Sequence, residues 1–111
     1  MFSIRFKFRN NIDFIHSFQW IDEAGNPVLL TGSTLRLHVK RKATDAKAIL
    51  ELTSENGLAT LSQTEPNKFT LKFPRYALPV GTYVFDLKRL FGGDHLPLAD
   101  GVIEVVAGVT S

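Results

Sequence analysis

Hydrophobic and polar side chains alternate strictly at the beginning of this chain, where residues 2–9 read Phe-Ser-Ile-Arg-Phe-Lys-Phe-Arg. Successive side chains of a β-strand point to opposite faces, so a period of two predicts a strand with one buried and one exposed face. We expect the apolar residues of this segment to face a core and its cations to face solvent. Residues 12–20 alternate again. His16 has the parity of Phe14 and Phe18, so we expect it to be a hydrogen-bonded histidine of the core.

Further short strands are expected at regular spacing, separated by turns rich in Gly, Asn, Asp and Pro. Their expected ranges are 35–39, 48–53, 58–62, 68–73, 82–90 and 101–107. Three connecting segments stand out. Residues 41–47 are polar and predict a loop, residues 74–80 predict a single helical turn that crosses between sheets, and residues 91–98 predict a Gly-rich exposed segment. Eight short strands without a convincing helix predict an all-β fold, an antiparallel sandwich of about 7–8 strands in a single domain of residues 1–111.

Residues 78–87, Leu-Pro-Val-Gly-Thr-Tyr-Val-Phe-Asp-Leu, make the sandwich class more specific. In immunoglobulin-like domains a Tyr near the start of strand F bonds back to the main chain at the crossing between sheets, two residues before a core position. Tyr83 has this placement, Phe85 fills the core position, and Gly81 permits a sharp turn before them. The usual core Trp of strand C is missing, because Trp20 ends the second expected strand instead. We therefore expect an immunoglobulin-like sandwich with a structural tyrosine corner at Tyr83.

Composition and charge narrow the function classes. The 111 residues include no Cys, which excludes a disulfide framework, a thiolate metal site and a cysteine nucleophile. Residues 1–42 carry seven Lys/Arg and three Asp/Glu, a net charge of +4, whereas residues 43–111 carry six and eight, a net charge of −2. This asymmetry could steer one subunit onto another or touch phosphate, although a mixed solvated surface is the simpler interpretation. No run approaches the length of a membrane span, and no signal peptide is recognised, so we expect no membrane association.

No catalytic or cofactor-binding constellation is visible. None of the histidines, His16, His38 and His95, lies at metal-ligand spacing from another, so no metal or cofactor is expected. Asp86 and Glu104 are outward carboxylates on adjacent strands, for which ion pairing to Lys88 or Arg89 is the simpler interpretation than glycosidase chemistry. Nucleophile-elbow and phosphate-loop patterns are missing as well. The sequence predicts a binding protein and not an enzyme.

Nucleic-acid binding is not expected to be the main function. Arg5, Lys7 and Arg9 share one face of the first strand and could follow phosphates. Single-strand binders also need aromatic platforms on the same surface, and here the aromatic residues take the opposite face. Outward cations on a first strand more often keep a sheet edge soluble. The one other feature that favours nucleic acid is a second basic run at residues 40–42.

With its strands placed, the chain resembles the short immunoglobulin-like structural proteins that tailed phages and prophages encode among their tail, neck and baseplate genes, including the N-terminal domain of phage baseplate upper proteins. Three pieces carry the resemblance over residues 10–110. They are Trp20–Pro27 with the Leu-Thr-Gly step at 30–32, the basic strand end Val39–Lys42, and the motif Leu78–Leu87 followed by a last strand that begins Asp100-Gly101-Val102.

The resemblance implies an adaptor, decoration or assembly protein of a virion, put together in the bacterial cytoplasm. It supplies no catalytic residues. The partners it implies are other phage structural proteins or further copies of this chain. Candidate contact residues lie in the first strand, the 41–47 loop and the 91–98 segment: Arg5, Lys7, Arg9, Lys42, Phe91, His95 and Leu96.

One alternative stays open, a carbohydrate-binding or cell-surface adhesion module. It needs several exposed aromatic residues on one face. Only Tyr76, Trp20 and Phe91 are candidates, and none are neighbours by parity.

Overall fold

The computed structural model describes residues 2–22 and 24–108, which form eight β-strands and no helix. The strands are β1 (Phe2–Arg9), β2 (Phe14–Gln19), β3 (Thr34–Lys40), β4 (Leu50–Thr53), β5 (Ala59–Leu61), β6 (Lys68–Phe73), β7 (Gly81–Phe91) and β8 (Asp94–Val106). The expected strands therefore form. No helix in the described ranges is long and apolar enough to cross a bilayer.

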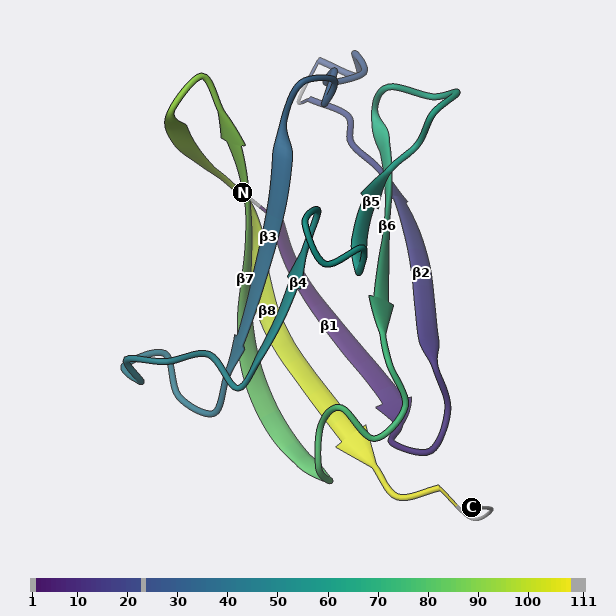
Figure 1. Ribbon diagram of the computed structural model, residues 1–111, viewed down its shortest axis with the longest axis vertical. Coiled ribbons are helices and arrows are strands. Elements are labelled where there is room, and N and C mark those ends of the chain that lie inside the picture. The colour runs from purple at the N-terminus through teal and green to yellow at the C-terminus, as the bar shows by residue number, and fades with distance from the viewer. Residues whose placement is uncertain (1, 23, 109–111) are drawn as a thin grey trace.

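Two sheets face each other in a sandwich (Figure 1). One has five strands in the order β1-β8-β7-β3-β4, and the other has three in the order β2-β6-β5. This is the all-β, immunoglobulin-like class that the sequence predicted. One pairing departs from the antiparallel expectation: β1 runs parallel to β8, with Phe2 opposite Ala99 and Arg9 opposite Val106. A parallel pair needs a long connection, and here nearly the whole chain lies between its two strands.

The inward faces of both sheets enclose one hydrophobic core. Leu35, Leu37 and Val39 are fully buried, as their alternation in β3 predicted. Phe6 packs its ring against aromatic rings of β2, β6 and β7, with centroid distances of 5.4 Å to Phe85 and 5.7 Å to Phe73. Edge-to-face and tilted arrangements of this kind stabilise aromatic pairs more than the burial of their surface alone would. The inward placement expected for the Phe2 side chain lies outside the described part.

The tyrosine corner forms as expected. Tyr83 is fully buried on β7, and its hydroxyl donates to the Pro79 carbonyl at 2.6 Å. The Arg41 guanidinium lies over the same ring, 5.6 Å from its centroid. The tyrosine thereby ties the start of β7 to the connection that brings the chain across from β6.

Tyr83→Phe is expected to lower the free energy of unfolding by about 1–2 kcal/mol, because it leaves the Pro79 carbonyl without its donor while the ring stays packed. Pro79 itself is exposed, so water can replace part of the lost bond. Urea unfolding of both proteins measures the difference. Tyr76→Phe is the matched control, since Tyr76 is 58% exposed. Equal stability of the two variants would contradict a structural role for the Tyr83 hydroxyl.

Two connections differ from the sequence prediction. Residues 74–80 form turns and no helical turn. Their main chain is tied instead to the β1–β2 connection, through Tyr76 N–H to the Asn10 carbonyl at 2.6 Å and Arg75 N–H to Asp13 Oδ1 at 2.8 Å. The second difference is at residues 91–98, which are not an exposed loop, because β8 begins at Asp94 and not at Gly101. β7 and β8 make a long hairpin whose two-residue turn consists of glycines with positive φ, the geometry that fits strand twist best.

Candidate binding edge of the larger sheet

The outer edge of β1 presents main-chain groups that no other strand of the described chain pairs. Asn10, directly after β1, donates its N–H to the Val106 carbonyl at 2.9 Å. In a parallel ladder, every second residue of a strand directs both its N–H and its C=O toward the neighbouring strand, and the residues between them direct theirs to the opposite side. The even-numbered residues of β1 therefore face β8, and the N–H and C=O groups of the odd-numbered residues 3–9 face outward. Because β1 is the last strand on its side of the sheet, these groups offer a ladder to an incoming strand.

The same residues of β1 carry a row of cations. Arg5, Lys7 and Arg9 are all exposed, on the common outward face that the alternation predicted. Glu104 on β8 contacts two of them, with Oε2 3.6 Å from Arg5 Nη2 and 3.9 Å from Lys7 Nζ. Such loose pairs between exposed side chains contribute little to stability. Arg9 belongs to neither pair, so the one carboxylate of Glu104 leaves this row of three cations with a net positive charge.

The opposite edge of this sheet, on β4, is blocked by the chain itself. Ser54 N–H donates to the Leu35 carbonyl at 3.1 Å, so the alternate residues 51 and 53 point their main-chain groups away from β3. The Asn56 side chain covers those groups. Its Nδ2 donates to the Glu51 carbonyl at 3.0 Å, and its Oδ1 accepts from Thr53 N–H at 3.0 Å. The amide occupies the place of a neighbouring strand, so the two edges of the sheet differ in their capacity to bind one.

An apolar hollow adjoins the open edge of β1. The two sheets meet here at a seam. The edge strand β1 of the larger sheet lies on one side of this seam, and the edge strand β2 of the smaller sheet lies on the other. Phe8 and Phe14 close one end of the seam, with stacked rings 4.8 Å apart. Toward the other end the seam opens into a hollow of about 340 Å³. Its lining residues are Ser3, Ile4, Phe18, Gln19, Trp20 and Ile21. On the far side of the sandwich, β5 contacts β3 and β4 instead.

His16 corrects one expectation at this seam. It has the parity of Phe14 and Phe18, but it is exposed and not a core residue. Its ring lies 4.7 Å from that of Phe18 and 6.1 Å from that of Phe14. β2 is an edge strand, and His16 stays exposed there although the Phe6 ring of β1 lies 6.5 Å from its ring. Parity could not show this, because it identifies the face of a strand but not whether another layer covers that face.

The predicted contact residues of the other two regions lie elsewhere. Lys42 is exposed in the loop that follows the end of β3, whereas the β7–β8 hairpin turn lies beside the start of β3. Phe91, the last residue of β7 before that turn, is 50% exposed. Its ring lies beside Gly32 and 5.8 Å from the Arg89 guanidinium, which also donates to the Leu29 carbonyl. The structure therefore gathers Arg5, Lys7 and Arg9 on β1. It places Phe91, His95 and Leu96 together in the β7–β8 hairpin and leaves Lys42 apart from both groups.

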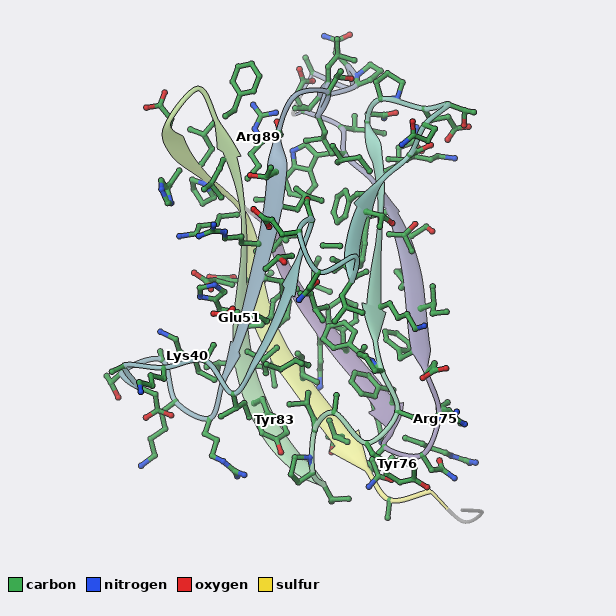
Figure 2. All side chains as sticks on the ribbon, viewed as in Figure 1. Lys40, Glu51, Arg75, Tyr76, Tyr83 and Arg89 are labelled. Atoms are coloured by element: carbon green, nitrogen blue, oxygen red, sulfur yellow. The ribbon has the colours of Figure 1, made fainter. Side chains whose placement is uncertain are left out.

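The last two predicted contact residues belong to the hairpin and not to a loop. His95 is exposed and pairs with Leu90, and Leu96 is half-buried opposite Arg89. Figure 2 shows Arg89 near the hairpin end of the molecule and Tyr76 near the other end. The exposed aromatic residues Tyr76 and Phe91 consequently form no common platform.

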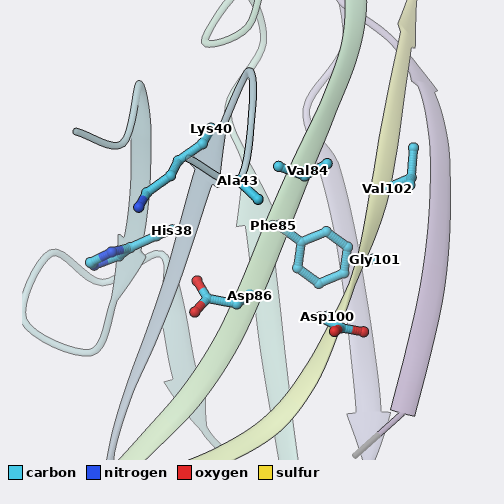
Figure 3. A pocket seen from close by; sticks show the side chains of 9 residues that line it. All are labelled: His38, Lys40, Ala43, Val84, Phe85, Asp86, Asp100, Gly101 and Val102. Atoms are coloured by element: carbon cyan, nitrogen blue, oxygen red, sulfur yellow. The ribbon is translucent and has the colours of Figure 1, made fainter. Parts of the chain in front are cut away.

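A polar row crosses the outer face of the larger sheet. Register places His38 between Glu51 on β4 and Asp86 on β7, and Asp86 opposite Asp100 on β8. His38 Nε2 lies 3.5 Å from Glu51 Oε1, and Ser3 Oγ donates to Asp100 Oδ1 at 3.1 Å. Figure 3 shows the Asp86 carboxylate directed toward the His38 side of a hollow of about 390 Å³.

This row does not form a metal site. Among the described residues, no three His, Asp or Glu side chains are grouped to hold a metal ion. The expected ion pairing of Asp86 and Glu104 with Lys88 or Arg89 is wrong. Glu104 contacts Arg5 and Lys7, and Arg89 reaches the Leu29 carbonyl instead. The sequence could not show these partners, because they depend on which strands become neighbours.

Comparison with known proteins identifies the fold. No protein-family model matches the sequence, and no curated protein sequence matches it. CopC from Methylosinus trichosporium OB3b has a similar structure, with a TM-score of 0.50 and 14% sequence identity over 97% of this chain and 91% of that chain. An endo-fucoidan hydrolase of glycoside hydrolase family 107 gives a TM-score of 0.47 and 14% identity, over 96% of this chain and 13% of that one. At such identities, the likeness to CopC concerns the fold alone. The chain has a CopC-like, immunoglobulin-like β-sandwich fold.

Proposed function

We propose that this protein is a non-enzymatic structural or assembly subunit of a tailed phage particle, in its tail, neck or baseplate region. It binds another virion protein through the open edge of β1. The observation that carries the proposal is the difference between the two edges of the larger sheet. Asn56 covers the β4 edge, whereas the β1 edge offers its main-chain groups over residues 3–9. Pairing such an edge with another chain supplies affinity without a catalytic constellation.

The sequence resemblance supports the choice of a phage particle as the setting. Its third piece contains features with a definite structural use in this sandwich. Tyr83 anchors the crossing to β7, and Gly101 lies directly against β1. A ligand-binding module for carbohydrate has less support, since Tyr76 and Phe91 lie at opposite ends of the molecule.

Mass spectrometry of purified particles tests the proposal. The particles come from the bacterial strain that carries the gene, after prophage induction, with an uninduced culture processed identically as the control. We expect the chain to copurify with the particles at a constant ratio to the major tail proteins. Its absence from the particles and from every assembly intermediate would exclude the structural role and favour the ligand-binding alternative.

A further inference from the structure

We propose that the open edge of β1 and the apolar hollow beside it bind an extended segment of a partner protein in which apolar and acidic residues alternate. This inference rests on the proposed function, because it names the chemistry of the partner at the same edge. It concerns a surface defined by residues 3–9 of β1 and the hollow between Ile4, Phe18 and Trp20. We call this surface the β1 receptor edge.

Main-chain geometry fixes the conformation of the partner. The outward N–H and C=O groups of residues 3–9 are spaced for a β-ladder, so the segment that satisfies them is itself a strand. A strand beside β1 extends the larger sheet over the seam between β1 and β2. Its side chains then alternate between the inner face, toward the hollow, and the outer face, beside the cations. One partner strand therefore engages both features at once.

The hollow selects apolar side chains on the inner face. Ile4, Phe18 and Trp20 are each partly exposed around it, and Ile21 is 39% exposed. A volume of about 340 Å³ is at the small end of the range of ligand pockets, and it accommodates a few aliphatic or aromatic side chains. Removing this surface from water favours binding in proportion to the apolar area covered. None of the described residues that line the hollow is charged.

The cations select acidic side chains on the outer face. A residue opposite Arg5, Lys7 or Arg9 on an adjacent strand has its Cβ within about 5.5 Å, the distance at which opposite charges stabilise a pair. Glu104 approaches two of these cations from the other side but does not bond them closely. Carboxylates of the partner would complete the neutralisation of the row.

A second copy of this chain does not fit the β1 receptor edge. Pairing β1 with β1 would bring the cation rows Arg5, Lys7 and Arg9 of two copies together, which is unfavourable. The β4 edge carries the complementary charge of Glu51, but the Asn56 amide already occupies its main-chain groups. The edge strands of the smaller sheet, β2 and β5, carry no carboxylate to meet the cations. We therefore infer that the partner is a different protein.

Fluorescence anisotropy with the full chain tests this inference. The probe is a fluorescein-labelled ten-residue peptide of alternating valine and glutamate, and a valine–lysine peptide of equal length is its counterpart. We expect the glutamate peptide to bind at least about tenfold more tightly, with a preference that weakens as salt rises to about 150 mM. Equal binding of the two peptides, or no binding of either, would overturn the inference. Mass spectrometry of the purified particles would still test the proposed function independently of the peptide result.

Two protein variants locate the binding. The double variant Arg5→Glu and Lys7→Glu should lower the affinity for the glutamate peptide by about tenfold or more. Lys88→Glu, on the same sheet but away from the edge, should leave that affinity unchanged. Lys7→Pro removes a donor that faces outward and is not used in the ladder with β8. It should abolish binding while circular dichroism shows the fold intact. If it fails to fold, the charge variants decide alone. Unchanged binding in the double variant would refute the assignment to β1.

Discussion

Replacing Gly101 by alanine is expected to detach β1 from the sandwich or to unfold the protein. A Cβ at this position would lie 1.7 Å from the Ile4 carbonyl oxygen and 2.8 Å from its carbonyl carbon. Both are main-chain atoms of the parallel neighbour, so no side-chain rotation relieves the clash. The backbone of Gly101 also has a φ of 158°, which side chains rarely adopt.

Gly101→Ala should lower the free energy of unfolding by about 3 kcal/mol or more, which is at the upper end for overpacked cores. The loss is large because a displaced β1 also withdraws two buried phenylalanines from the core. These are Phe6 and Phe8, of which 5% and 8% stay exposed. Urea unfolding measures the loss, and hydrogen exchange of the β1 amides shows whether the strand alone is released.

Gly93→Ala is the matched control. Its φ of 86° causes backbone strain, but nothing lies within 4 Å of the added Cβ. We expect this variant to lose only about 1 kcal/mol. If Gly101→Ala were no more destabilising than Gly93→Ala, close contact between β1 and β8 would not be what demands glycine.

Removing the Asn56 side chain is expected to destabilise the protein and to open the β4 edge. Asn56→Ala takes away the donor to the Glu51 carbonyl and the acceptor shared by the Thr53 and Leu58 N–H groups. The partly buried Thr53 N–H thereby loses its acceptor. The loss should be about 1–2 kcal/mol.

The uncovered edge should also let copies associate. With its β4 groups free, one molecule can pair that edge with the cationic β1 edge of the next. The direction of the strands makes this pairing antiparallel. Sedimentation of the variant should therefore show concentration-dependent oligomers that high salt weakens. Asn26→Ala is the control, because the Asn26 side chain takes part in no hydrogen bond of the described chain and is exposed. An Asn56→Ala protein that stays monomeric at all concentrations would show that another feature protects β4.

The two edges of the larger sheet differ in their capacity to pair with another strand. An exposed strand edge promotes uncontrolled association, and proteins protect such edges in several ways. Here β4 is short and covered by an amide, whereas β1 is longer, cationic and open beside an apolar hollow. The charge of β1 opposes its pairing with a second β1, and we propose that it selects an acidic partner. In this proposal, the choice of binding partner follows from which edge of the larger sheet is left open.

The sequence by itself determined the strands, the class of the fold and the anchor at Tyr83. Each of these depends on local information. The alternation in residues 2–9 and 35–39 fixes which side chains share a face, because successive residues of a strand point in opposite directions. The spacing from Pro79 to Tyr83 fixes a hydrogen bond within five residues. For the same reason, the common face of Arg5, Lys7 and Arg9 was readable before any strand was paired.

Only the tertiary structure decided which strands are neighbours and which edges remain free. The parallel pairing of β1 with β8 joins residues almost a hundred positions apart, and it alone gives Gly101 its role. Exposure of His16, the cover that Asn56 gives β4, and the hollow at Trp20 depend equally on distant segments. Alternation specifies the two faces of a strand but neither its partner nor the layer above it. Those are set by how the whole chain buries its apolar faces, which no local pattern contains.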